Sequence, residues 1–229
     1  FTILTNANGE KEYAFIMTDI SKFHLINDYW GYETGTKILN FVLRRMELFS
    51  DSLFVNRYHS DIFVAVIDTT GRKPSDVKNY LEESNRQITR EILKTFPINY
   101  FHLNTGIYYL KDTNTPAEQI ISHANIVREK AKMELSGVYE YTSEVALNEQ
   151  RRADTIHSFK SALMQKEFKI YFQPKICGRD QTIASAEALV RWQRGKENMW
   201  YPDMFLPILE ETGEIQALDY YVYEETFAW

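Results

Sequence analysis

The fold is decided by TDISKFHLINDYWGYETGTKIL, residues 18–39. An apolar run at residues 13–17 leads into this stretch and predicts a buried strand that ends at Asp19. Apolar residues at helical spacing follow, stop at Gly31 and resume beyond Gly35, which predicts a helix with a break in it. Strand ends and the helix starts after them are where α/β proteins hold phosphates and metals. Asp19 is therefore a candidate ligand, and its alternative role is the N-cap of the following helix.

Strand and helix patterns alternate as far as residue 141. In chain order the sequence first predicts a strand at 12–19, a helical region at 20–48, and a hairpin with strands at 53–60 and 62–68. A helix capped by Ser75 follows and runs to 94, and one long or two short strands lie within 98–110. A helix then runs from the capping box at 115–118 to Gly137, and a strand follows at 138–141. This order implies helices packed on a mainly antiparallel sheet, which is an α+β domain.

Composition limits the function classes. The 229 residues are 44% hydrophobic and 25% charged, as in ordinary globular proteins. The net charge of −6, with no long basic run, argues against nucleic acid as a partner. The single Cys177 excludes an internal disulfide framework and fits a reducing compartment. No apolar run reaches the roughly 18–20 residues of a membrane span, so we expect a cytoplasmic chain, whose parent could be tethered to a membrane through segments outside it.

Residues 19–35 follow the pattern Asp-Ile-x-x-Phe-x-x-x-Asn-Asp-x-x-Gly-x-x-x-Gly, which resembles the first signature of diguanylate cyclase (GGDEF) domains. The resemblance implies that Asp19 and the backbone carbonyl of Ile20 occupy metal-binding places. It implies that Asn27 occupies the guanine-binding place and that Lys132 matches a phosphate-contacting lysine. It also implies the α+β fold of that family, a mainly antiparallel sheet flanked by helices.

The second signature of that family is degenerate in this sequence. Residues 57–63 are RYHSDIF where the family has an arginine, an aromatic residue and the GGDEF turn. Asp61 keeps one acid, but Ile62 replaces the adjacent acid with a side chain that neither binds a metal nor takes a proton. His59 and Ser60 replace the glycine pair that lets the backbone approach a nucleotide closely. The resemblance therefore implies a degenerate domain that performs no cyclisation.

What remains is a vestigial site. Asp19 and Asp61 would be its vestigial metal ligands, and Asn27 and Lys132 its vestigial nucleotide contacts. We expect weak binding of GTP and no tightly bound metal. A second guanine contact of the family falls on Thr36, which cannot replace it. The alternative from the residues alone is that Asp19 caps a helix, Asn27 bonds to the backbone and Asp61 is solvated in a turn.

One strand in the last third of the chain has charged residues on one face. Residues 186–192, AEALVRW, place Glu187, Leu189 and Arg191 on one face and apolar residues on the other. A strand inside an α/β barrel is apolar on both faces. An inward-facing Glu and Arg are costly there unless they serve a ligand or one another. The alternatives are a buried Glu187–Arg191 pair or a solvated edge.

Two motifs in this region, Phe172-Gln173-Pro174-Lys175 and the strand at 186–192, resemble the opening of EAL domains, the cyclic di-GMP phosphodiesterases. The resemblance implies that Glu187 is a ligand of Mg²⁺ or Mn²⁺. It also implies that Arg191 contacts a phosphate and that Gln173 contacts the substrate, cyclic di-GMP.

The chain therefore divides into a degenerate GGDEF-like domain at 1–143, a linker helix at 144–166 and an N-terminal fragment of an EAL-like domain at 167–229. A (β/α)₈ barrel needs about 250 residues, so the last part is a truncated start, and the other ligands would lie beyond Trp229. We expect an inactive chain with a regulatory role in a bacterial cyclic di-GMP signalling protein whose parent hydrolyses cyclic di-GMP. The alternative is a non-catalytic module for dimerisation or partner docking, with both halves degenerate.

An unfinished barrel also has consequences for assembly. Its two strands leave unpaired edges and an apolar face that the missing neighbours would cover. That face would have to fold back onto the first domain, pair with another copy, or remain partly disordered. We favour pairing between copies, which predicts a homodimer.

Overall fold

The computed structural model describes residues 11–48, 51–110, 114–134 and 137–228 of a chain that divides into two compact units, Phe1–Thr142 and Ser143–Trp229. The first unit contains β1 (Tyr13–Ile20), α1 (Phe23–Glu47), β2 (Ser52–His59), β3 (Ile62–Asp68), α2 (Pro74–Thr95), β4 (Leu103–Leu110), α3 (Ala117–Glu134) and β5 (Val138–Glu140).

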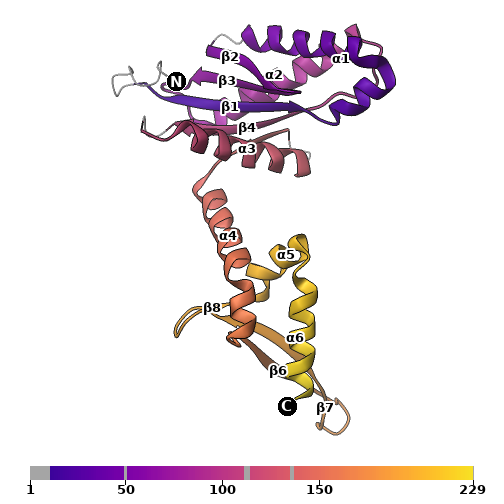
Figure 1. Cartoon of the computed structure of the whole chain (residues 1–229), viewed down its shortest axis with the longest axis vertical. Helices are drawn as coiled ribbons and strands as arrows, with labels where there is room; N and C mark the ends of the chain where they lie inside the picture. The colour runs from indigo at the N-terminus through magenta and orange to yellow at the C-terminus, as the bar shows by residue number, and fades with distance from the viewer. Residues whose placement is uncertain (1–10, 49–50, 111–113, 135–136, 229) are drawn as a thin grey trace. The chain divides into compact units, whose positions relative to one another are not determined.

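The five strands form one sheet in the order β2-β3-β1-β4-β5, antiparallel throughout except where β5 joins β4. Ala14 and Ile16 of β1 pack with α1 and α2, whereas Phe15 and Met17 pack with α3. Figure 1 shows α3 on one side of the sheet and the other two helices across it. Both faces of β1 are covered, which explains its unbroken apolar run. The predicted α+β fold, a mainly antiparallel sheet flanked by helices, is confirmed.

The start of α1 differs from the prediction. The helix begins at Phe23, and its N-cap residue is Lys22, which has the left-handed φ of 52°. Asp19 lies inside β1 instead, so its interpretation as a helix N-cap is wrong. Gly31 has a non-helical φ of 82° within α1. The predicted break is therefore confirmed, at a residue that adopts this conformation without steric cost.

Two further boundaries moved. The N-cap of α2 is Lys73, with Pro74 in the first turn, so Ser75 is not the cap as predicted. A single strand, β4, begins at Leu103 rather than near 98. Ile98 and Phe101 are still buried in the core, although they precede the strand. The apolar side chains of Ile98 and Phe101 therefore reflect packing in the core and do not mark a strand.

The second unit contains α4 (Ser143–Met164), β6 (Phe168–Ile176), β7 (Ile183–Gln193), β8 (Met199–Trp200), α5 (Pro202–Thr212) and α6 (Ile215–Phe227). Its three strands form a separate antiparallel sheet in the order β6-β7-β8. The described strands close no barrel, in agreement with a truncated EAL-type start. Among the described residues, no helix is both long enough and apolar enough to cross a membrane.

The second unit has its own hydrophobic core. Phe168 and Trp192, which lie opposite one another across β6 and β7, pack against α4, α5 and α6. Phe159 of α4 meets Phe168 edge to face, and Phe205 of α5 meets both strand aromatics. The expected alternatives for this apolar face were folding back onto the first domain, pairing between copies, or partial disorder. This expectation was incomplete, because helices of the same unit cover the end of the sheet around Phe168 and Trp192, while Ile176 and Ile183 at its other end remain exposed.

The surroundings of His123 in α3 predict how the free energy of unfolding depends on pH. Its ring stacks on Tyr141 at 4.1 Å between centroids and lies 5.0 Å from that of Tyr108. Its Nδ1 is buried and has no hydrogen-bond partner among the described residues. Burial lowers the pKa of His123 below the ordinary value of 6.5. The unfolded chain therefore binds this proton more readily, and the histidine's stabilising effect, complete above about pH 6.5, is lost as the pH falls.

We expect His123→Phe, which keeps an aromatic ring but no titrating nitrogen, to lose less stability than the wild type between about pH 7.5 and 5. Urea unfolding of both proteins across this range measures the difference. Burial also lowers the pKa of His102, but His102 is present in both proteins, so the difference isolates His123. Parallel pH profiles would contradict the prediction.

Candidate functional site

The residues singled out in the first unit meet at the end of β1. There the chain leaves β1, the hairpin of β2 and β3 turns, and the last turn of α3 comes close. A cavity of about 310 Å³ lies at this point, within the range of about 300–1,000 Å³ typical of small-molecule sites. It is lined by Ile20, Lys22, Phe23, His24, Asn27, Ser60, Asp61 and Lys132. The structure thus brings together three of the four predicted residues, Asn27, Asp61 and Lys132.

The cavity has more positive than negative side chains. Lys22, between β1 and α1, and Lys132 of α3 line it, and Asp61 is the one carboxylate among the described residues of the lining. The side chain of Lys132 is 42% exposed, and its Nζ lies 3.4 Å from Oδ2 of Asp19. Two lysine amines beside one carboxylate favour an anionic ligand, such as a phosphate.

Gly35 leaves the space that the side chain of Asn27 occupies. A Cβ at Gly35 would lie 2.0 Å from Oδ1 of Asn27 and 3.1 Å from the ring of Phe23. Only glycine therefore leaves room for the amide of Asn27 at the cavity wall. Thr36, next in sequence, is exposed and donates its hydroxyl to the carbonyl of Tyr32 at 2.9 Å, so it does not line the cavity.

The fourth predicted residue, Asp19, is buried and does not line this cavity. Its Oδ1 accepts a hydrogen bond from Nδ2 of Asn104 at 2.7 Å. Its Oδ2 accepts from Nη1 of Arg128, and the two side chains are only 2% and 5% exposed. Asp19 is therefore the acceptor in a buried ion pair.

Arg128 was missed by the sequence analysis. It precedes Lys132 by one helical turn, so both cations point from α3 to the same carboxylate. The sequence held only a weak signal, because an arginine at the edge of an apolar stripe usually keeps its charged end in water and its burial is seen only in the structure.

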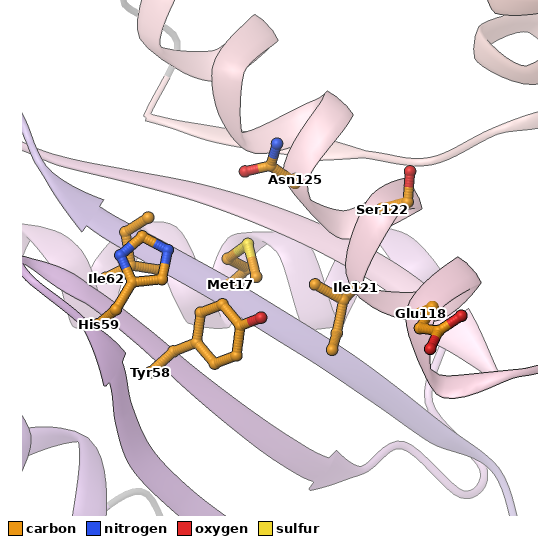
Figure 2. A pocket seen from close by; sticks show the side chains of 8 residues that line it. All are labelled: Met17, Tyr58, His59, Ile62, Glu118, Ile121, Ser122 and Asn125. Carbon is orange, nitrogen blue, oxygen red and sulfur yellow. The ribbon is translucent and has the colours of Figure 1, made fainter.

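A second cavity, of about 390 Å³, lies on the other side of the hairpin, between β2, β3 and α3. Figure 2 shows Ile62 and His59 on the strand side and Ile121 and Asn125 on the helix opposite. The full lining is Met17, Tyr58, His59, Ile62, Glu118, Ile121, Ser122 and Asn125. Ile62 also lies directly opposite Asp19 in the pairing of β3 with β1. The position that the resemblance assigns to an acid therefore holds an apolar side chain here, which lines the cavity with Met17, Ile121 and several polar residues.

These residues do not fit the metal centre that the resemblance implies. Such a centre needs several carboxylates around one point. Here Asp61 lines the cavity, whereas Asp19 is buried against Arg128. Among the described residues, no group of three or more His, Cys, Asp or Glu side chains is arranged to hold a metal ion.

The three residues singled out in the second unit lie on one face of the sheet. Gln173 and Glu187 are directly opposite one another in the pairing of β6 with β7. Glu187 is 52% exposed and its Oε2 lies 3.2 Å from Nζ of Lys175. Arg191 donates to the carbonyl of Val190 at 2.7 Å and lies 5.2 Å above the ring of Tyr201.

This geometry decides between the alternatives for the strand at 186–192. A buried Glu187–Arg191 pair is wrong, because Glu187 is exposed and pairs with Lys175 instead. The charged face is solvated in this chain, while Trp192 on the opposite face is buried. One exposed carboxylate beside a lysine does not by itself make a metal site.

Comparison with known proteins agrees with both resemblances. Residues 2–136 match the family model described as "Diguanylate cyclase, GGDEF domain", and residues 156–228 match the model described as "EAL domain". The resemblance inferred from the two sets of motifs is confirmed.

Two curated relatives are similar over almost the whole chain. One is the bifunctional diguanylate cyclase/cyclic di-GMP phosphodiesterase MucR of Pseudomonas aeruginosa, which is 23% identical over 94% of this chain and 32% of its own length. The other is the cyclic di-GMP phosphodiesterase PdeR of Escherichia coli, 26% identical over 95% of this chain and 33% of its own. The chain thus spans about a third of the length of these relatives.

A solved structure supports the fold of the first unit. The GGDEF domain of DgcB from Caulobacter crescentus, in complex with c-di-GMP, aligns with 58% of this chain and 80% of its own, with a TM-score of 0.50 and 17% sequence identity. At this identity the alignment shows the fold alone.

Proposed function

This chain belongs to the diguanylate cyclase GGDEF-domain family, and from that premise we propose that its first unit is a regulatory domain that no longer makes cyclic di-GMP. The partial EAL match places the proposal in cyclic di-GMP signalling. We propose that residues 1–143 regulate, that 144–166 act as a linker helix, and that 167–229 begin an EAL domain that hydrolyses cyclic di-GMP in the whole protein.

The observation that carries this proposal is the chemistry of the hairpin turn. Ile62 is an apolar residue of the cavity lining that lies opposite Asp19, at a position where cyclisation would require an acid. Ser60 has a left-handed φ of 47°, a conformation that favours glycine, and its side chain lines the other cavity. The turn keeps the backbone geometry of a glycine but fills space that a nucleotide would approach.

Nucleotide binding without turnover is what the remaining residues support. Asn27, Asp61 and Lys132 share the cavity of about 310 Å³, with a second lysine at its rim. We propose that GTP binds weakly there, with the amide of Asn27 at the guanine and Lys132 at a phosphate. Binding of this kind would make the first unit a sensor of GTP.

In the second unit we propose that Glu187 becomes a ligand of Mg²⁺ or Mn²⁺ in the whole protein, with Gln173 and Arg191 contacting cyclic di-GMP. The shared face of these residues supports the assignment. The whole barrel would add further ligands around Glu187, which a single exposed carboxylate needs to hold a divalent cation.

A second candidate is a dimerisation or docking module. Helix α6 exposes three aromatic side chains at helical spacing, Tyr220, Tyr223 and Phe227. The rings of Tyr223 and Phe227 stack at 6.5 Å. Exposed aromatics grouped in this way are typical of protein–protein contacts. This surface supports a homodimer, or coverage by the remainder of a barrel.

Titration of the chain with GTP in a calorimeter tests the proposal. We expect weak binding in the wild type and about 5–10-fold weaker binding in Asn27→Ala, because a lost hydrogen bond is worth about 1 kcal/mol or more. Gly35→Ala should reproduce this loss, since its Cβ displaces the amide of Asn27. Thr36→Ala is the matched control and should bind as the wild type does.

Two results would count against this function. Micromolar binding that neither substitution changes would mean that GTP uses another site. Absence of binding, together with a stable dimer by light scattering, would favour the docking module instead.

A further inference from the structure

We propose that Arg128 is a built-in cation that takes the place of a divalent metal at Asp19, so that the first unit binds neither Mg²⁺ nor Mn²⁺ there. The inference deepens the proposed function, because it concerns the end of β1 beside the nucleotide cavity. The proposed function concerns the nucleotide, whereas the role of Arg128 is to neutralise a buried carboxylate.

Burial makes a cation at Asp19 necessary. A carboxylate removed from water is strongly destabilised unless a cation or several hydrogen bonds replace its hydration. Asp19 has both: Nη1 of Arg128 at Oδ2, and Nδ2 of Asn104 at 2.7 Å from Oδ1. Lys132 contributes a second positive charge at 3.4 Å from Oδ2. The negative charge that would attract a metal is thus already compensated.

The guanidinium of Arg128 is held from its other side as well. Oδ1 of Asn125 accepts from Nη2 at 2.7 Å and from Nε at 3.2 Å. A carboxylate oxygen of Glu129 also accepts from Nη2. A guanidinium presents its donors in a rigid, planar fork, and here all three of its nitrogens are engaged. Arg128 is therefore fixed in one orientation and does not swing away to admit a metal.

Helix α3 is close enough to the sheet for this contact because of Gly106 in β4. A Cβ at Gly106 would lie 2.2 Å from the carbonyl oxygen of Ala124 and 2.6 Å from the backbone nitrogen of Arg128. Only glycine allows the backbones to approach this closely. The position of Arg128 over Asp19 thus depends on the packing of helix on strand, in addition to the ion pair.

The local balance of charge disfavours a divalent cation. Among the described residues, the charged groups in ion pairs with Asp19 or Arg128 are Asp19 and Arg128 themselves, Glu129 and Lys132, and their charges sum to zero. His102 faces the same carboxylate, and Ile62 of β3 contributes no charge. Hard divalent cations require several oxygen ligands. A metal here would also have to break a buried ion pair.

Titration with Mn²⁺ alone, without nucleotide, tests the proposal on the 229-residue chain. In the wild type we expect no change in Tm and no paramagnetic broadening of the NMR signals near Asp19 and Asn104. Lys37→Met, which removes an exposed lysine paired with Glu33 and keeps the Arg128–Asp19 pair, should behave in the same way.

Removal of the arginine should reverse this behaviour. Arg128→Leu leaves Asp19 buried without the guanidinium, so the Tm of this variant should fall by roughly 10 °C. Adding Ile62→Glu, which places a second carboxylate opposite Asp19, should allow Mn²⁺ to raise the Tm again. Asp19→Asn with Arg128→Leu removes both charges, so this double variant should recover much of the loss and ignore Mn²⁺. It also gives a folded comparison if Arg128→Leu alone fails to fold.

Broadening near Asp19 in the wild type would overturn the proposal. So would an Arg128→Leu variant as stable as the wild type, or an Arg128→Leu variant with Ile62→Glu whose Tm does not rise with Mn²⁺. None of these measurements involves GTP, so their outcome is independent of the proposed function. The proposed function fails instead if the chain forms cyclic di-GMP or binds GTP at another site.

Discussion

Incubated with GTP and Mg²⁺ or Mn²⁺, the 229-residue chain should form no cyclic di-GMP above a reaction without protein. The loss of one acid–base group alone costs about 10²–10⁴-fold in rate. By the resemblance, Ile62 takes the place of the acid, and His59 and Ser60 take the places of two glycines. Asp19, the remaining strand-end carboxylate, is paired with Arg128. We therefore expect metal binding, proton transfer and the close approach of the nucleotide all to be impaired.

Chromatography of the reaction products, with an active diguanylate cyclase as positive control, measures this result. A triple variant, His59→Gly with Ser60→Gly and Ile62→Glu, restores the composition of the turn. We expect it to remain inactive, because Arg128 still occupies Asp19. Product from the wild type would refute the loss of cyclisation, and product from the triple variant would refute the role of Arg128.

Replacement of Trp192 by alanine should destabilise the second unit by about 3–5 kcal/mol, the usual cost of removing a buried tryptophan. Trp192 is 0% exposed and its ring lies 4.8 Å from that of Phe168 and 5.5 Å from that of Trp200. Its Nε1 donates to Oε2 of Glu167 at 2.9 Å. The substitution therefore leaves a cavity at the centre of this core and an acceptor without its donor.

Hydrogen exchange measured residue by residue separates the two units. Protection should fall across β6, β7 and α4 in Trp192→Ala and stay unchanged in β1 and β4. Phe227→Ala is the matched control, because that aromatic ring is 85% exposed and its removal should change stability by less than about 0.5 kcal/mol. Equal loss of protection in both units would contradict an independent core in the second unit.

The sequence by itself determined the order of elements and the chemistry of the hairpin turn. Alternation and helical spacing report which face of each segment is buried, so β1, the broken α1 and the β2–β3 hairpin could all be predicted. The prediction that Ile62 replaces an acid rests on the motif around this one residue and stays a prediction. Helix boundaries were less certain, as Lys73 and Ser75 show, because a cap depends on local backbone geometry.

Only the tertiary structure decided which groups meet. Asp19 and Arg128 are 109 residues apart in sequence, and no local pattern pairs them. Their contact depends on the close approach of α3 to β4 at Gly106, a result of packing across the whole sheet. The same holds for Glu187, whose exposure depends on which elements cover its face. Periodicity predicts that a face is buried, but the partner that covers it is selected by long-range packing, and that partner decides whether a carboxylate binds a metal or an arginine.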